Sequence, residues 1–197
     1  MTQNNIKIAI TGGICSGKST VAQTIREQGY SVVSCDEIYS ELLKESHFLN
    51  LLEKVFGNIK NDNGTLNRTK LSEIVFSDRG KLEKLNSITH PQIMQRAISE
   101  MEDGGINFCE VPLLFEGGFE RLFDNVIVVL RDDDIRVEEL VKRNKINEKQ
   151  ALSRINSQFN YKNCDFTKCY VINNNSNLVE LQKNTLIVLE KIRKDYI

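Results

Sequence analysis

With 197 residues, of which 40% are hydrophobic and 27% charged, the chain has the composition of an ordinary globular domain and enough length to bury a core. The net charge is −1 and there is no long basic run, which argues against nucleic-acid binding. No apolar run is as long as a membrane span and no signal-peptide pattern is present, which argues against membrane insertion and export. Five cysteines without a CxxC pair and only two histidines argue against a zinc site and indicate reduced thiols, so we expect a cytoplasmic protein.

Apolar and β-branched runs that alternate with helical patterns predict the secondary structure. Residues 6–10 predict a buried strand that ends at Thr11-Gly12-Gly13, and a helix is expected from Lys18 until Gly29 ends it. Further strands are predicted at 30–34, 106–111, 125–130 and 169–172, and further helices at 132–142, 147–157 and 178–193. This alternation predicts an α/β fold whose parallel sheet carries helices on both faces.

The interval between the second and third strands breaks the alternation. It has a helical pattern without a convincing strand, and it is too long for a crossover connection and too apolar for a loop. We therefore expect one domain over residues 1–197, with residues 37–103 as a helical insertion that covers the site. Pro91 is expected to divide this insertion: a helix should end before Thr89-His90 and a new one should begin with Pro91 near its first position.

The stretch GGICSGKST, from Gly12 to Thr20, contains the GxxxxGK[ST] pattern of a phosphate-binding loop. Glycines let successive backbone N–H groups point at phosphate oxygens, and the helix that begins near Lys18 adds the positive end of its dipole. Lys18 is expected on the β- and γ-phosphates, and the hydroxyl of Ser19 on Mg²⁺. The alternative is a glycine-rich turn that binds nothing, but the preceding strand and following helix favour binding of a nucleoside triphosphate.

Three classes of protein share this loop: small-molecule kinases, GTPase switches and ATP-driven motors. A guanine-specific switch needs an NKxD element, but the nearest string, Asn144-Lys145-Ile146-Asn147, lacks the aspartate, and no DxxG occurs. A motor is usually larger and carries a strand that ends in consecutive acids, whereas the third strand ends in Glu110-Val111-Pro112. Small size, one loop and a helical insertion favour a kinase that excludes water from the phosphoryl group.

Several strings, in this order from residue 6 to about residue 175, carry a wider resemblance: TGGICSGKST, VVSCDEI, FGN…GTLNRTKL, LNSITHPQI, EVPLLFEGG and RINSQ. Together they resemble the dephospho-coenzyme A kinase family, with ITHP and VPLLFE more specific than the loop. The resemblance implies a P-loop kinase core with a five-stranded parallel sheet of order 2-3-1-4-5, a helical substrate domain and a mobile helical lid over 132–158. It also implies Mg²⁺-assisted transfer of phosphate from ATP to the ribose 3′-hydroxyl of dephospho-CoA, the last step of coenzyme A synthesis.

The resemblance assigns roles to matching residues, and each keeps a structural alternative. Asp36 is expected to face the acceptor hydroxyl and to be catalytic with Lys18, but it could instead be a helix N-cap. Arg68 could instead be a solvated residue of a first helical turn, His90 a helix cap and Asn174 part of a turn. The expected ATP-binding residues are Gly12, Gly13, Ile14, Cys15, Ser16, Gly17, Lys18, Ser19, Thr20, Arg143 and Asn174. The expected acceptor-binding residues are Thr11, Asp36, Arg68, His90, Phe115 and Glu116.

Three departures from the family pattern leave other functions open. Glu139 stands where the family commonly has a second lid arginine, which Arg136 one helical turn earlier could replace. Ser34-Cys35-Asp36 stands where the family usually has DAD, and Cys15 stands at a usual glycine, which places a side chain against the phosphates. The chain could therefore also be a related kinase for another small alcohol or nucleotide, or a nucleotide-binding regulatory module without catalysis.

Overall fold

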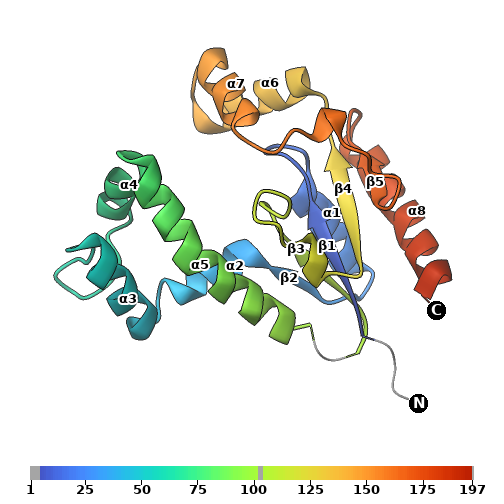
Figure 1. The fold of residues 1–197 in the computed structure, drawn as a ribbon. Coiled ribbons are helices and arrows are strands. Elements are labelled where there is room, and N and C mark those ends of the chain that lie inside the picture. The colour runs from blue at the N-terminus through green and yellow to red at the C-terminus, as the bar shows by residue number, and fades with distance from the viewer. Residues whose placement is uncertain (1–4, 102–103, 197) are drawn as a thin grey trace. The chain divides into compact units, whose positions relative to one another are not determined.

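The computed structural model describes residues 5–101 and 104–196 of the chain (Figure 1). They form two compact units. The first contains the described residues of Met1–Val33 and Glu100–Ile197, and the second consists of Ser34–Ser99. Within the described residues, none of the helices combines the length and the apolar character needed to cross a membrane.

A five-stranded sheet in the order β2-β3-β1-β4-β5 forms the centre of the first unit. Strand β1 pairs in parallel with β3 and β4, and β4 pairs in parallel with β5. The strands are β1 (Asn5–Thr11), β2 (Val32–Ser34), β3 (Gly105–Glu110), β4 (Asn125–Leu130) and β5 (Tyr170–Asn173). The order expected from the resemblance, 2-3-1-4-5, is therefore confirmed, although β2 begins two residues later than predicted.

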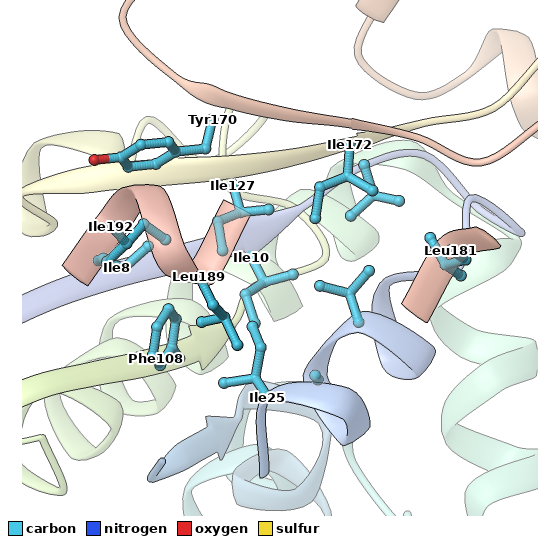
Figure 2. Packing of buried hydrophobic residues seen from close by; sticks show 13 residues of the cluster. Ile8, Ile10, Ile25, Phe108, Ile127, Tyr170, Ile172, Leu181, Leu189 and Ile192 are labelled. Carbon is cyan, nitrogen blue, oxygen red and sulfur yellow. The ribbon is translucent and has the colours of Figure 1, made fainter. Parts of the chain in front are cut away.

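Helices α1 (Lys18–Glu27) and α8 (Leu178–Tyr196) pack against each other on one face of this sheet. Alternate residues of each strand point at them, because neighbouring side chains of a strand face opposite sides. Figure 2 shows the resulting core, which includes Ile8, Ile10, Ile25, Phe108, Ile127, Ile172, Leu181 and Leu189. Ala9 and Val128, which alternate with these residues, are also fully buried, as expected for a parallel sheet that is covered on both faces.

Two short helices, α6 (Asp133–Asn144) and α7 (Glu148–Asn156), lie between β4 and β5 in the sequence and pack against each other. Asn147 begins α7 with a capping box, because its side chain accepts from the backbone N–H of Gln150 and its own N–H donates to that glutamine. Figure 1 shows the pair beyond the carboxyl end of β4. The short 3-10 helices are η1 (Glu120–Leu122) and η2 (Tyr161–Asn163).

The second unit is built from four helices: α2 (Cys35–Leu42), α3 (Ser46–Phe56), α4 (Arg68–Phe76) and α5 (Arg79–Ser99). Helix α5 packs on both α2 and α4. Arg96 of α5 donates to Glu45 at 2.6 Å and to Glu41 at 3.0 Å, which ties the end of α5 to the last turn of α2 and to the connection that follows it. Residues that share the buried interior include Ile38, Phe48, Leu52, Leu71 and Met94.

The predicted helix break at Pro91 is wrong. Helix α5 runs without interruption from Arg79 to Ser99 and contains Thr89, His90 and Pro91. A proline inside a helix removes one backbone hydrogen bond, at a cost of about 3 kcal/mol. On either side of it Leu85, Thr89, Ile93, Met94 and Ala97 are buried. Because breaking the helix would expose part of this stripe, packing outweighs the lost hydrogen bond.

Candidate active site

The phosphate-binding pattern occupies the connection from β1 to α1, and two glycines give this loop its shape. Gly12 has φ 151° and Gly17 has φ 101°, which are left-handed values that favour glycine. A Cβ at Gly12 would collide with the carbonyl oxygen of Val129, and one at Gly17 would collide with the side-chain nitrogen of Asn174. The strand, loop and helix therefore stand in the arrangement that the pattern requires.

Lys18 lies over the loop that precedes it. Its Nζ donates to the carbonyl oxygen of Gly12 at 2.8 Å and to that of Gly13 at 3.0 Å. These contacts hold the ammonium group at the mouth of the loop, at the first turn of α1. A fixed positive charge beside a helix N-terminus is suited to a phosphate group.

Ser19 and Glu110 form a pair of oxygen donors beside the lysine. The hydroxyl of Ser19 donates to Oε1 of Glu110 at 2.8 Å, and Glu110 is only 8% exposed at the end of β3. A hydroxyl with a carboxylate is an oxygen donor set of the kind that Mg²⁺ prefers. In the sequence, Glu110 served only as evidence against a motor. Its position at the carboxyl end of a strand was the signal that could have identified it as a partner of Ser19.

Asn174 supports the loop from the adjoining end of the sheet. Its Nδ2 donates to the carbonyl oxygen of Ser16 at 2.8 Å, its backbone N–H donates to that of Leu130, and it is 7% exposed. Asn174 therefore binds the loop and the end of β4, and is not only part of a turn between strand and helix. Its expected place near the adenine stays a prediction.

Cys15 has φ 60°, a left-handed backbone conformation in which a residue other than glycine is strained. This conformation gives a physical reason for a glycine at this position. The side chains of Ile14 and Cys15 pack against a small apolar core made by α6 and α7, whose members are Leu140, Ala151 and Ile155. The side chain of Cys15, whose thiol is expected beside the phosphates, thus packs against α6 and α7, the helices of the expected lid.

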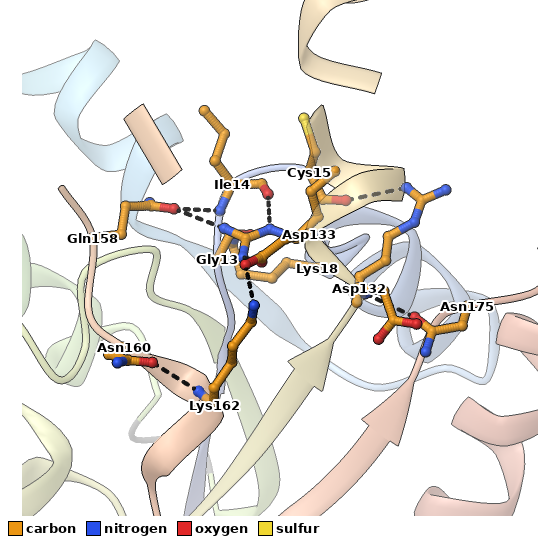
Figure 3. A network of polar contacts seen from close by, with 12 residues as sticks. Gly13, Ile14, Cys15, Lys18, Asp132, Asp133, Gln158, Asn160, Lys162 and Asn175 are labelled. Carbon is orange, nitrogen blue, oxygen red and sulfur yellow. Dashed lines mark hydrogen bonds and ion pairs between the residues drawn. The ribbon is translucent and has the colours of Figure 1, made fainter. Parts of the chain in front are cut away.

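Side chains of residues 131–158, which include the expected lid, also reach the loop through polar contacts, which Figure 3 shows. Arg136 of α6 is buried, and its Nε donates to the carbonyl oxygen of Ile14 at 2.9 Å. Gln158, just after α7, accepts from the N–H of Ile14 at 2.7 Å. Arg131 donates to the carbonyl oxygen of Cys15 at 3.1 Å and lies 3.9 Å from Glu139. Glu139, which stands where the family commonly has an arginine, therefore lies beside an arginine that binds the loop.

Arg143, the lid residue expected over the nucleotide, lies elsewhere in the described structure. It is exposed near the end of α6, and its Nε donates to the side chain of its neighbour Asn144 at 3.1 Å. The structure does not bring Arg143 to the loop, whereas it does bring Arg136 there. The sequence identified Arg136 only as a possible replacement.

A cavity of about 560 Å³ opens between the loop, the ends of β4 and β5 and the two segments that join the lid to the sheet. Asp133 lies in its wall, and a hydrogen bond from Lys162, together with the charge of Arg136, lowers the pKa of this carboxyl group. Burial raises the pKa of Tyr161, in the same wall, to about 12, so its phenol stays protonated at neutral pH. Lys162 and Arg136 thus share one anionic partner.

The loop after β3 contacts the segment that follows the lid. The ring of Phe115 stacks on Phe159 with centroids 4.8 Å apart, and Oε1 of Glu116 accepts from the backbone N–H of Phe159 at 2.9 Å. Thr11, which is fully buried, has its hydroxyl 3.4 Å from that of Tyr161. Three of the residues expected to bind the acceptor therefore contact residues 159–161.

In the second unit, Asp36 is the second residue of α2 and is exposed. The N-cap of α2 is Ser34, whose Oγ accepts from the N–H of Glu37 at 3.3 Å, so the alternative of Asp36 as an N-cap is wrong. The carboxyl group lies in the first turn of the helix. Asp36 is thus an exposed side chain rather than a cap.

Arg68 and His90 also belong to the second unit. Arg68 is the first residue of α4, after the N-cap Asn67. Burial raises the pKa of Tyr39, and the positive charge of Arg68 partly offsets that rise, so the two side chains are close enough to interact. His90 is half-buried within α5 and is not a helix cap; burial lowers its pKa.

The GxxxxGKS loop connects the first strand of a parallel 2-3-1-4-5 sheet to the first helix, and further helices contact this loop. This arrangement defines a P-loop kinase of small molecules. A crystal structure of a Thermus thermophilus protein has the same fold, with a TM-score of 0.81 and 29% identity over 96% of this chain and 99% of that one. This likeness covers the helical second unit as well as the sheet.

The family is shown by sequence. Residues 6–180 match the model of the dephospho-CoA kinase family. A dephospho-CoA kinase of Fusobacterium nucleatum is 37% identical over 179 residues, which are 89% of this chain and 93% of the relative. One of Listeria innocua is 38% identical over 192 residues, which are 93% and 96% of the two chains. The chain belongs to the dephospho-CoA kinase family.

Proposed function

We propose that this chain transfers the γ-phosphoryl group of ATP to the ribose 3′-hydroxyl of dephospho-CoA, giving coenzyme A and ADP in the last step of coenzyme A synthesis. The observation that carries the proposal is the group of Lys18, Ser19 and Glu110 on a correctly shaped phosphate loop, in a chain of this family. Phosphoryl transfer depends mainly on positioning and on charge stabilisation, and this group supplies both.

ATP is held by the loop from Gly12 to Thr20. Backbone N–H groups and the first turn of α1 receive its phosphates, and Lys18 neutralises charge on the transferring group. Ser19 and Glu110 would hold Mg²⁺, which would supply positive charge to the β- and γ-phosphates. Asn174 supports the loop through its hydrogen bond to Ser16. A contact of Arg143 with the nucleotide stays a prediction.

The roles toward the acceptor are proposed residue by residue. Asp36 accepts the proton of the 3′-hydroxyl as that oxygen attacks phosphorus, so the proton ends on its carboxylate. Arg68 binds the diphosphate of the acceptor through paired N–H groups. His90 is neutral near pH 7 because its pKa is lowered, and it serves as a contact rather than as a cation. Thr11, Phe115 and Glu116 line the acceptor side.

The test compares three acceptors in a coupled assay of ADP release: dephospho-CoA, adenosine and gluconate. The proposal expects release with dephospho-CoA and little with the other two. Faster release with adenosine or gluconate would support a kinase for another small molecule. Binding of ATP without release with any acceptor would support a regulatory module. A cytoplasmic location stays a prediction.

A further inference from the structure

We propose that Arg136 and Gln158 are positioning residues that fix the phosphate loop at Ile14 and thereby set its affinity for nucleotide phosphates. The proposal rests on the proposed function only in that the loop binds ATP. Both polar backbone groups of Ile14 are held by the lid: its N–H donates to Oε1 of Gln158 at 2.7 Å, and its carbonyl accepts from Nε of Arg136 at 2.9 Å. Nη2 of Arg136 also donates to that glutamine oxygen at 3.3 Å, which closes a ring of three contacts (Figure 3).

Arg136 is itself held in a single orientation. It is 7% exposed, and its Nη1 donates to Asp133 at 2.8 Å. Lys162 also contacts Asp133, at 2.6 Å, and lowers its pKa, so the partner of the guanidinium is anionic at neutral pH. The guanidinium lies so close to Gly13 that a Cβ there would collide with Nη2. A planar fork with these fixed contacts suits the task of holding a backbone in place.

The loop has a reason to need such support. Next to Ile14, Cys15 has φ 60°, a strained conformation that a chain maintains only when its surroundings impose it. Its carbonyl oxygen is held by Arg131, and its side chain packs with that of Ile14 on the core of α6 and α7. Because the N–H groups of the loop have to face phosphate oxygens together, a change at Ile14 would disturb nucleotide binding.

The departure from the family pattern at Glu139 agrees with a role for Arg136 in supporting the loop. The family commonly has an arginine there, but in this chain Glu139 lies 3.9 Å from Arg131. Arg136, one helical turn earlier, reaches the loop instead. Three donors of Arg136 are committed to protein groups: Ile14, Asp133 and Gln158. Those commitments favour a role in positioning the loop over direct contact with phosphate.

The experiment is a double-mutant cycle on the full chain with Arg136→Gln and Gln158→Leu. Calorimetry with Mg·ADP gives a readout that needs no acceptor, and steady-state assays give KM for ATP and KM for dephospho-CoA. Each single variant is expected to weaken ADP binding and to raise KM for ATP by about tenfold, with KM for dephospho-CoA within about twofold of wild type. The double variant should lose little more than either single one, because both act through Ile14.

Two further variants separate a positioning role from a simple charge effect. Arg136→Lys keeps the charge but lacks the fork, so it should stay nearly as defective as Arg136→Gln. Lys149→Gln removes an exposed lid charge and should bind ADP like wild type. Losses that multiply in the double variant, full recovery with lysine, or unchanged ADP affinity in both single variants would each overturn the proposal. Tight ADP binding by a wild-type protein that does not phosphorylate dephospho-CoA would instead count against the proposed function alone.

Discussion

The hydroxyl of Ser19 and the buried carboxylate of Glu110 are joined by a hydrogen bond of 2.8 Å, although 91 positions separate them in the chain. The pair exists because β3 lies beside β1, so the end of β3 meets the helix that follows the phosphate loop. Neighbouring strands thus place a carboxylate where the metal of an ATP complex is expected. The first prediction tests this pair.

Glu110→Gln keeps the size of the side chain and removes its charge. We expect the Mg²⁺ concentration for half-maximal activity to rise by about tenfold, because one anionic ligand is lost. ADP release measured over a Mg²⁺ series checks this expectation. Glu190→Gln, at an exposed site on α8, is the matched control. An unchanged Mg²⁺ dependence in Glu110→Gln would remove Glu110 from the metal site.

Lys18→Ala should lower kcat/KM by about 10³-fold or more while the thermal midpoint changes little. The lysine supplies charge to the transferring phosphoryl group in a site that excludes water, where such a contact is worth most. Steady-state kinetics and a thermal melt measure the two quantities. Normal activity in the folded variant would contradict the assignment of the phosphate loop.

Asp36→Asn should lower kcat by about 10²-fold or more and leave the affinity for Mg·ADP within about twofold of wild type. The amide keeps the shape of the side chain but cannot accept the proton. Ser34 provides the N-cap of α2, so the substitution should not unfold the helix. A collapse of nucleotide affinity with normal kcat would show that Asp36 acts on the metal or on the structure.

Cys15 can be tested by comparing Cys15→Gly with Cys15→Ala. Both remove the sulfur, but only glycine is unstrained at φ 60°. The glycine variant should therefore be more stable than the alanine variant by about 1 kcal/mol, measured by urea unfolding. Equal stability, or a more stable alanine variant, would mean that the loop relaxes and that the left-handed conformation is not imposed.

His90 makes stability depend on pH. Burial lowers its pKa from the ordinary value of 6.5, so the unfolded chain binds a proton more readily than the folded one. The stabilisation is fully present above pH 6.5 and is lost as the pH falls through the folded-state pKa. Between about pH 7 and pH 5, the unfolding free energy of His90→Gln should therefore fall less steeply than that of wild type.

The loop and strands could be predicted because their signals are local. The glycines and Lys18 lie within a few residues of each other, and the apolar run before them ends one residue before β1 does. Resemblance to a family added the strand order, which no local pattern determines. The helix through Pro91 could not be predicted in this way, because burial against α2 and α4 is a property of the folded unit.

The contacts around the loop needed the structure for the same reason. Gln158 lies 144 positions from Ile14, and Arg136 lies 122 positions from it. Both side chains could be noted in the sequence, and Arg136 could be predicted as a replacement for a missing arginine. What it could not supply was the place of the lid helices beside the loop, and therefore the role of Ile14 as their common partner.

The proposed transfer to the ribose 3′-hydroxyl is tested most directly by identifying the atom that becomes phosphorylated. The wild-type protein is incubated with Mg·ATP and dephospho-CoA, and the product is analysed by phosphorus NMR with proton correlation. We expect one new phosphate on the ribose 3′-oxygen, in amounts equal to the ADP formed, and product formation slowed by about 10³-fold or more with Lys18→Ala. A phosphate at another position, or no product from a folded protein that binds ATP, would contradict the proposed transfer.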